Sequence, residues 1–478
     1  MATTEQAVTQ GSLQELAKRH LWMHFTRLGA YADHDVPIIA RGEGCHVWDE
    51  KGNRYFDGLS ALFCVNIGHG RADVAQAGAD QAKELEFFTN WSYAHPPAIE
   101  LAARIAGLAP GDLNRVFFTS GGSEAVESAI KLSRQYHKLT GKPNKTKIVA
   151  REIAYHGTSL GALAATGITP LREPFEPLTP GGVHVPNTNL FRLAPGMLSE
   201  SDLAEAVAHK IEFEGPDTVA AVIMEPVQNA GGCFTPPEGY WQRVREICTE
   251  YDVLLISDEV ICSWGRLGHW FGAERYDYVP DLITTAKGIT SAYAPMGALI
   301  ASDRVAEPFL EGHSSFIHGF TFAGHPISCA VSMANIDVME NEGILENVKA
   351  HEGEFRAMLE SLRDIPIVGD VRGAGYFHAI ELVKDRGRPG ASGRGSSGAP
   401  TAGETYAQFS DEESETLLRG FLSGELFKRG LICRADDRGD PVIQLSPPLI
   451  AGPEEFAEIE SVLRPVLEEA TERMGVGA

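Results

Sequence analysis

The chain has 478 residues, of which 43% are hydrophobic and 22% are charged, and this composition excludes wholesale disorder, a collagen-like repeat and a disulfide-stapled miniprotein. The net charge of −24 disfavours contact with nucleic acid or anionic lipid, so we expect neither a nucleic-acid nor a membrane partner. Seven dispersed cysteines without a CxxC pair, a polar start and no long apolar stretch predict a cytoplasmic protein without disulfides and without a metal site.

In chain order, the first predicted elements are an amphipathic helix over 13–28 and a hairpin over 44–57. Short apolar runs then alternate with helical segments, and these runs lack the in/out alternation of a half-exposed strand. The predicted strands are 115–119, 147–150, 219–224, 253–257, 282–285 and 297–301, and the helices between them include 124–139 and 240–251. This order predicts an α/β fold with a mainly parallel sheet covered by helices on both sides.

The last third of the chain predicts a smaller α+β region, with a long helix over 334–362 and strands at 375–382 and 442–445. Between these strands, 11 of the 19 residues of 386–404 are Gly, Ser or Pro. Such a segment buries too little apolar surface to offset its ordering entropy, so we expect a flexible surface insertion. The predicted division is a large domain over 71–335 and a small domain formed by 1–70 and 336–478.

The first chemical signal follows the predicted strand that ends at Thr119. Here the residues Ser-Gly-Gly-Ser-Glu, at 120–124, lead directly into a helix. Free N–H groups and the dipole at a helix N-terminus attract anions, and glycines let the backbone approach a phosphate closely. Gly121, Gly122 and Ser123 are therefore candidates for a phosphate site, with a plain strand–turn–helix cap as the alternative.

Two further signals follow later strands at the same expected edge of the sheet. Asp258 ends one apolar strand, where ligands bind in open α/β sheets, although a solvated loop carboxylate is the competing interpretation. Lys287 ends another, and a lysine buried there needs a partner or a lowered pKa, which suits an amine that forms a Schiff base. A phosphate cup, an acid for a ring nitrogen and a nucleophilic lysine are the combination that pyridoxal phosphate requires.

From about residue 15 to residue 470 the chain resembles the class III pyridoxal-phosphate aminotransferases of fold type I. Among them it is most similar to the omega-transaminases, which act on beta-alanine or amines with pyruvate. The resemblance rests on the motifs TSGGSE at 119–124, YHG at 155–157, LLISDEVICSWG at 254–265, TAKG at 285–288, GFTFAGHP at 319–326 and LSPPL at 445–449. It implies a seven-stranded sheet in the large domain and a homodimer with shared active sites, with a tetramer left open.

The resemblance also implies roles for residues around the cofactor. Lys287 would form the Schiff base and carry the proton between substrate and cofactor, and Asp258 would keep the ring nitrogen protonated. The other implied contacts are ring stacking by Tyr155, packing of the opposite ring face by Val260, phosphate binding by Gly121, Gly122 and Ser123, a place near the ring oxygen for Glu225, and a contact from Thr321 to the phosphate in the neighbouring subunit. No role is assigned to His156 or His318.

On the substrate side, the resemblance implies that Phe63 and Trp91 wall the pocket, although packing in the hydrophobic core competes with this interpretation. Arg434 would bind a substrate carboxylate and swing aside for an uncharged amine, unless it is simply a solvated arginine.

The resulting prediction is a transaminase that works by a ping-pong mechanism, with an amine or omega-amino acid as donor and pyruvate as acceptor. A 2,1-aminomutase, a decarboxylase, or a class III enzyme with a diamine or 4-aminobutyrate donor stays open, because one fold hosts several reactions. A non-catalytic relative is disfavoured because Lys287, Asp258 and Tyr155 are all present. A Rossmann dehydrogenase is excluded because no GxGxxG motif follows an early strand.

Overall fold

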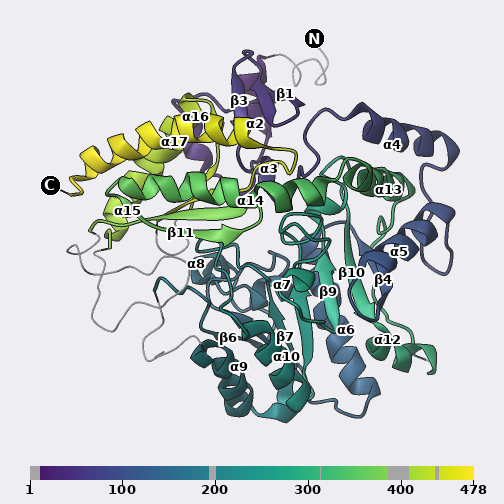
Figure 1. Ribbon diagram of the computed structural model, residues 1–478. Coiled ribbons are helices and arrows are strands. Elements are labelled where there is room, and N and C mark those ends of the chain that lie inside the picture. Colours follow the sequence, from purple (N-terminus) through teal and green to yellow (C-terminus); the bar gives the residue numbers. More distant parts are fainter. Residues whose placement is uncertain (1–10, 193–200, 313, 386–407, 437–440, 478) are drawn as a thin grey trace, which may run out of the picture.

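The computed structural model describes residues 11–192, 201–312, 314–385, 408–436 and 441–477. These residues form one seven-stranded sheet and two four-stranded sheets. In Figure 1 the large sheet and its helices occupy the lower part of the molecule, and the smaller sheets lie above it with the first and last parts of the chain. The predicted α/β class, with a large sheet beside a smaller α+β region, is confirmed.

The large sheet has the strand order β4–β10–β9–β8–β7–β5–β6. Its strands are β4 (Leu113–Thr119), β5 (Lys147–Arg151), β6 (Gly182–Val185), β7 (Val219–Met224), β8 (Leu254–Asp258), β9 (Leu282–Thr285) and β10 (Gly297–Ser302). Strands β5 to β9 pair in parallel, whereas β10 is antiparallel to both β4 and β9. The sequence analysis missed β6, because its four residues are mostly half-buried and give no continuous apolar run.

Helices cover both faces of this sheet. The elements involved include α6 (Gly122–Leu139), α7 (Leu160–Ala165), α9 (Ser201–Glu214), α10 (Tyr240–Glu250) and α12 (Asp303–Leu310). Because successive side chains of a strand point to opposite faces, Ile223 of β7 clusters with residues of α6, whereas Val222 and Met224 cluster with residues of α9 and α10. Both faces are therefore buried, which explains the unbroken apolar runs of the sequence.

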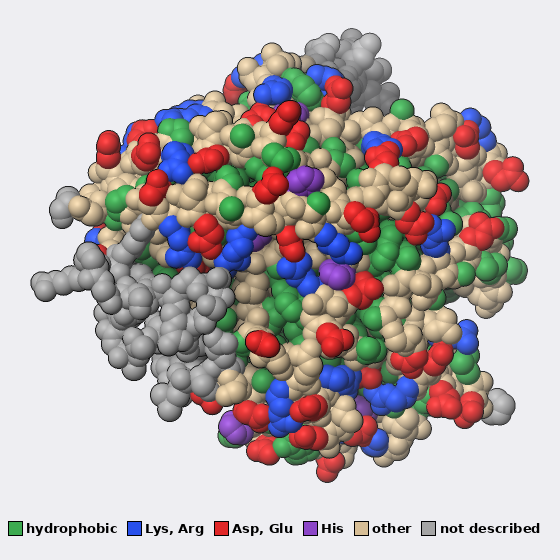
Figure 2. Space-filling view, viewed as in Figure 1, with side chains coloured by type: hydrophobic (Ala, Val, Ile, Leu, Met, Phe, Trp, Pro, Cys, Tyr) green, Lys and Arg blue, Asp and Glu red, His purple; other side chains and the backbone are tan. Residues whose placement is uncertain are grey.

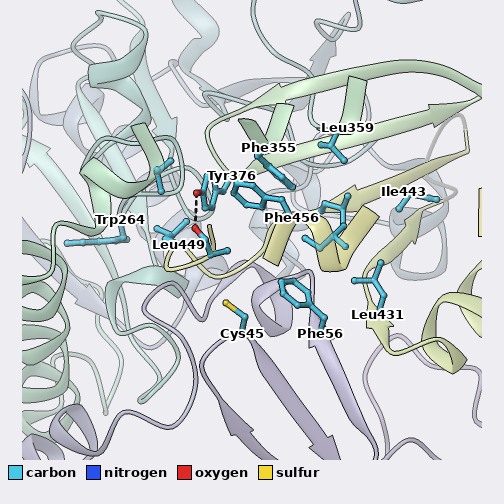
Figure 3. Close-up of a cluster of buried hydrophobic side chains, with 14 of the residues drawn as sticks. Cys45, Phe56, Trp264, Phe355, Leu359, Tyr376, Leu431, Ile443, Leu449 and Phe456 are labelled. Carbon is cyan, nitrogen blue, oxygen red and sulfur yellow. Dashed lines mark hydrogen bonds between the residues drawn. The ribbon is translucent and has the colours of Figure 1, made fainter. Parts of the chain in front are cut away.

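The smaller sheets bring the two ends of the chain together. One sheet contains β1 (Ile39–Glu43), β2 (His46–Asp49), β3 (Arg54–Asp57) and β13 (Leu431–Ile432), and the other contains β11 (Val368–Ala374), β12 (Phe377–Leu382), β15 (Val442–Leu445) and β14 (Arg434–Asp436). The helices packed around them include α14 (Ile344–Ser361) and α17 (Pro453–Met474). Figure 3 shows their shared core, in which Phe355 of α14 lies beside Tyr376 and Phe456, and Phe56 of β3 lies nearby.

The remaining described helices do not belong to either of these two groups. They are α2 (Leu13–His20), α3 (Ser60–Phe63), α4 (Ala72–Glu84), α5 (Pro96–Leu108), α8 (Thr169–Arg172), α11 (Gly272–Arg275), α13 (Pro326–Asn341), α15 (Asp411–Leu417) and α16 (Ser423–Lys428). Short 3₁₀ turns occur at Leu28–Tyr31, Glu173–Phe175, Pro216–Thr218, Lys287–Ile289 and Leu362–Asp364, and a π-helical turn joins α15 to α16 at Leu418–Leu422.

Three predicted elements differ from the structure. The helix expected over 13–28 ends at His20, after a last turn rich in basic residues, and Leu21 is already extended. The helix expected over 334–362 is two helices, α13 and α14, because Gly343 adopts a φ of +62° between them. The strand expected from residue 375 begins at Phe377, because Gly375 turns the chain with a φ of +56°.

Strands β1, β11, β13 and β14 were also not predicted from the sequence. In β11, Asp370 and Arg372 interrupt the apolar pattern, yet both are buried because they pair with each other and Arg372 also pairs with Glu381. The predicted insertion at 386–404 lies outside the described residues. The domain boundaries near residues 70 and 335, and the cytoplasmic location, stay predictions.

Two absences among the described residues bear on the classes of partner. No described helix is both long and apolar enough to cross a membrane. Within the same residues, no three His, Cys, Asp or Glu side chains converge as metal ligands would.

Arg266 connects the large sheet to the smaller part of the molecule. Its guanidinium is fully buried and donates to four neutral oxygens. These acceptors are Ser60 Oγ, Asn66 Oδ1 and the carbonyl oxygens of Tyr376 and Pro447. Burial lowers the pKa of Arg266 to about 9, because it removes the water that a guanidinium normally keeps. The four oxygens take the place of that water.

Candidate active site

A cavity of about 160 Å³ lies at the carboxyl edge of the large sheet. Its lining residues follow β4, β5, β7, β8 and β9, which all run in one direction because β10 is antiparallel to both of its neighbours. Ligands of open α/β sheets bind at this edge. Of the residues predicted from the sequence, the cavity brings together Gly122, Ser123, Tyr155, Glu225, Asp258, Val260 and Lys287.

One end of the cavity is the N-terminus of α6, where Gly121 is the N-cap residue. A Cβ atom on Gly121 would meet no other atom within 4 Å, so the space beside this helix terminus is open. Ser123 Oγ lies next to it and accepts hydrogen bonds from the N–H groups of Thr158 (3.2 Å) and Ser159 (3.0 Å). Backbone amides, a hydroxyl and the helix dipole at one place suit a phosphate group.

Asp258 and His156 form a buried pair in the wall of the cavity. His156 Nδ1 lies 2.7 Å from Asp258 Oδ2, and both side chains are almost completely excluded from solvent. Asp258 Oδ1 accepts hydrogen bonds from Val260 N and from Thr284 Oγ1, each at 3.2 Å. Three donors thus hold the carboxylate in one orientation, as a partner for a protonated ring nitrogen requires.

His156 is a site residue to which the sequence analysis gave no role. Its Nε2 atom is buried and has no hydrogen-bond partner among the described residues. The available signal was its position beside Tyr155, directly after a strand of the parallel sheet. Gly157, Ile261 and Cys262 also line the cavity and were missed, because each lies one or two residues beyond a predicted contact.

Glu225 is a second buried carboxyl group, at the end of β7. Its Oε1 accepts a hydrogen bond from Asn229 N (3.1 Å), and its Oε2 has no hydrogen-bond partner within the described part of the chain. Burial raises the pKa of Glu225 to about 7, and the charge of Asp258 acts in the same direction, while His156 and Arg151 oppose it. Glu225 therefore changes its protonation state near neutral pH.

Lys287 follows β9 with a φ of +48°, in the left-handed region, and its side chain reaches the same cavity. Burial lowers the pKa of its amine, although Cys64 and Asp258 oppose this effect. A lowered pKa increases the fraction of unprotonated amine, which is the nucleophilic form. The next residue is packed closely, because a Cβ on Gly288 would lie 2.3 Å from Nδ2 of Asn66 and 2.9 Å from Cβ of Trp264, so a larger residue would displace these buried side chains.

The residues predicted to contact the substrate, or the cofactor of a neighbouring subunit, are dispersed. Phe63 is 2% exposed and packs edge-on against Phe377, with ring centroids 5.6 Å apart, in a core cluster that includes the cavity residue Cys262. Trp91 is 60% exposed and lines a separate groove of about 950 Å³. Thr321 is exposed, and Arg434, on β14, lies near enough for its charge to lower the pKa of Lys287 further. Their roles toward a substrate or a second subunit stay predictions.

Comparisons with known proteins agree with this geometry. A family model of the class III aminotransferases matches residues 30–467. The chain is 55% identical to a probable aminotransferase of Mycobacterium tuberculosis, over 95% of this chain and 94% of that protein. It is 37% identical to a putrescine–pyruvate aminotransferase of Pseudomonas aeruginosa, over 95% of this chain and 96% of that protein.

A solved structure gives the same result for the fold. The crystal structure of an (S)-enantioselective omega-transaminase from Thermomicrobium roseum matches with a TM-score of 0.88 and 38% identity, over 96% of this chain and 98% of that one. The resemblance seen in the motifs is thus confirmed over nearly the whole chain, and the protein belongs to the class III aminotransferases.

Proposed function

We propose that the protein is an omega-transaminase that uses pyridoxal phosphate to move an amino group from an amine or omega-amino acid to pyruvate, in a ping-pong mechanism. Class III aminotransferases use this cofactor. The observation that carries the proposal is the convergence of Lys287, Asp258 and the N-terminus of α6 on one cavity. These groups match the three parts of the cofactor, namely its aldehyde, its ring nitrogen and its phosphate.

The described residues fit the cofactor in kind and in order along the sheet edge. Gly121, Gly122 and Ser123 would hold the phosphate, in the open space beside the N-terminus of α6. Tyr155 and Val260 would cover the two faces of the ring. Pyridoxal phosphate, when bound, supplies an aldehyde that condenses with amines and a ring that accepts the electron pair released at the substrate carbon.

The protein's own side chains then hold and move protons. Asp258, oriented by His156, would keep a proton on the ring nitrogen through its negative charge. Lys287 has a lowered pKa, and its unprotonated amine would take the proton from the substrate carbon and deliver it to the cofactor. Glu225, beside Asp258, adds a group that can be neutral or charged at working pH.

Pyruvate as acceptor is supported by the name of the Pseudomonas aeruginosa relative and by the position of Arg434 near Lys287. A guanidinium is the natural partner of a buried carboxylate. Pyruvate carries a carboxylate, whereas only some amino donors do. Arg434 would therefore bind pyruvate in one half-reaction and move aside for an uncharged amine in the other.

We also propose that the protein works as a homodimer. The groove beside α5 is mostly apolar, and its residues Trp91 and Ile317 are 60% and 91% exposed. Hydrophobic side chains gather at the surface around α4 and α5 (Figure 2). A second copy of the chain would cover this surface, and Thr321 would then reach the phosphate of the partner's cofactor.

A donor screen with pyruvate as acceptor tests the proposed function. Beta-alanine, taurine, diamines and 1-phenylethylamine are each incubated with the purified yellow protein, and alanine formation is measured. We expect alanine from at least one donor. In the absence of pyruvate, we expect the same donor to convert the cofactor to its amine form. Conversion of an amino acid to its positional isomer without any keto acid would instead identify an aminomutase.

A further inference from the structure

The loop 225–234 lies between the cavity and the C-terminal sheet and contacts both. It is a buried hairpin turn, closed by hydrogen bonds between the backbones of Gln228 and Phe234 (2.9 Å in each direction). Its first residue is Glu225, whose Oε1 accepts the N–H of Asn229 (3.1 Å). The conformation at Asn229 therefore decides whether Glu225 keeps its hydrogen bond.

Asn229 is held by a side chain from the other sheet. Gln444, on β15, is fully buried, and its Nε2 donates to the carbonyl oxygen of Asn229 (2.5 Å) and lies 3.3 Å from its side-chain oxygen. The residues beside it in the strand, Ile443 and Leu445, are apolar and fully buried. Burying a glutamine amide is unfavourable unless its hydrogen bonds are formed. The contact to Asn229 satisfies the Nε2 donor of Gln444, whereas its Oε1 has no hydrogen-bond partner among the described residues.

We propose that Gln444 is a positioning residue for Glu225. Its amide fixes Asn229, and the N–H of Asn229 in turn favours the ionised form of the Glu225 carboxyl group. Gln444 is also the register partner of Arg434 on β14. One side chain thus ties the strand that carries the proposed carboxylate-binding arginine to the carboxyl groups at the cofactor end. This inference deepens the proposed function and rests on it for the roles of Glu225 and Arg434.

The other groups that act on Glu225 come from the large sheet. They are Arg151 on β5, His156 after β5, Asp258 at the end of β8, Cys262 after β8 and Lys287 after β9. Gln444 comes from the C-terminal sheet and acts through Asn229. Removing the amide of Gln444 therefore changes one of the contacts that set the ionisation of Glu225, and it leaves the charged groups in place.

The test is a pH titration of Glu225 in the full chain freed of cofactor. Infrared difference spectra report the protonated carboxyl band, which is assigned by its loss in Glu225→Gln. Gln444→Met keeps the length of the side chain and removes the donor. We expect it to raise the titration midpoint of Glu225 by about one pH unit, the typical size of one hydrogen bond's effect on a carboxyl group.

Gln228→Met is the matched control. Gln228 is another buried glutamine of the same loop, and its Nε2 donates to the carbonyl oxygens of Glu152 (3.0 Å) and Ala230 (3.3 Å). Its loss removes comparable hydrogen bonds and leaves the path from Gln444 through Asn229 to Glu225. An unchanged midpoint in Gln444→Met, or equal shifts in the two variants, would overturn the proposal.

A second measurement leaves Gln444 in place. In the chain labelled with ¹⁵N at glutamine, the side-chain amide resonance of Gln444 should shift with the midpoint of the Glu225 band, and this shift should disappear in Glu225→Gln. A Gln444 resonance that ignores the titration of Glu225 would contradict the proposal even if Gln444→Met fails to fold. Because both titrations are made without cofactor or substrate, a failed donor screen would refute the proposed function and leave their result standing.

Discussion

The two ends of the candidate site are built in different ways. At the proposed cofactor end, Lys287, Asp258 and Glu225 lie at or just after the carboxyl ends of strands of one sheet, and Asp258 is fixed by three hydrogen bonds. Of the residues proposed to contact the substrate, Trp91 lies on an exposed loop beside a separate groove, and Arg434 lies on a strand of three residues. The comparison teaches that the sheet of one chain is enough to bring the cavity groups together, whereas the residues proposed for substrate recognition lie on segments outside the large sheet.

The largest effect is expected at the nucleophile. Lys287→Ala should abolish turnover and leave the protein folded, because no other amine among the described side chains lines the cavity. Borohydride treatment of the yellow wild-type protein should link the cofactor covalently to Lys287, and peptide mapping should find this label on that residue. Lys145 is the internal comparison, since it is buried but donates to the carbonyl oxygens of Pro216, Val219 and Tyr251 at the opposite edge of the sheet, where β7 and β8 begin. Label on Lys145, or on any lysine except Lys287, would refute the assignment.

A smaller loss is expected at the acid of the same end. Asp258→Asn keeps the size of the side chain but removes the charge that holds a proton on the ring nitrogen. We expect the rate of the amine half-reaction to fall by about a hundredfold or more, the usual consequence of losing a charged partner in a buried site.

The neighbouring acid provides the control for Asp258. Glu259 accepts hydrogen bonds from the N–H groups of Gly272 (2.6 Å) and Ala273 (2.8 Å) at the start of α11 and does not line the cavity. Glu259→Gln should therefore lower Tm, whereas the rate of the protein that remains folded should change little. Near-normal rates in Asp258→Asn would mean that another group pairs with the ring nitrogen.

At the substrate end, the comparison predicts a selective effect. Arg434→Ala should raise KM for pyruvate by about one to three orders of magnitude, because a buried carboxylate would lose its cation. The half-reaction with an uncharged amine should change little. Arg429→Ala is the matched control, since Arg429 belongs to the same segment and pairs with Glu425 and Glu469. Equal losses in both half-reactions would show that Arg434 supports the pocket and does not read the carboxylate.

The smallest effect concerns Glu225 and stability. Its pKa rises from about 4.5 to about 7 on folding, so the folded state binds this proton more tightly than the unfolded state. The contribution of Glu225 to stability is therefore full below about pH 4.5 and declines as the pH rises to about 7. Glu225→Gln stays neutral, so its Tm relative to wild type should increase by a few degrees between pH 5 and about 7.5.

An exposed carboxyl group provides the comparison for that measurement. Glu43 lies on β1 and pairs with Arg41 at the surface, where an ion pair contributes little to stability, so the Tm of Glu43→Gln should stay close to that of the wild type. A pH-independent Tm difference in Glu225→Gln would contradict the raised pKa of Glu225.

The sequence predicted the cofactor end well for a physical reason. Strands buried on both faces leave unbroken apolar runs, and the residues that follow such runs in a parallel sheet belong at one edge of it. His156 was missed because a hydrogen bond to Asp258, 102 residues away, leaves no local pattern. The breaks at His20 and Gly343 were missed because helical periodicity continues across them, whereas the backbone does not.

The substrate end was predicted less completely because its geometry depends on long-range packing. Phe63 is buried beside Phe377, more than 300 residues later in the chain, and nothing in its local sequence distinguishes a pocket wall from a core residue. The same limit applies to Gln444, whose partner Asn229 lies outside its own sheet.

The buried guanidinium of Arg266 has a consequence for how the molecule comes apart. Its acceptors belong to the segment that contains Ser60 and Asn66, to the turn at Tyr376 and to the loop at Pro447, while Arg266 itself follows β8. If any one of these segments detached first, the cation would lose oxygens while the rest of the protein still kept water away from it. Opening at any of these seams therefore costs hydrogen bonds of a buried cation, and we expect this contact to favour joint unfolding of the large and small parts of the molecule.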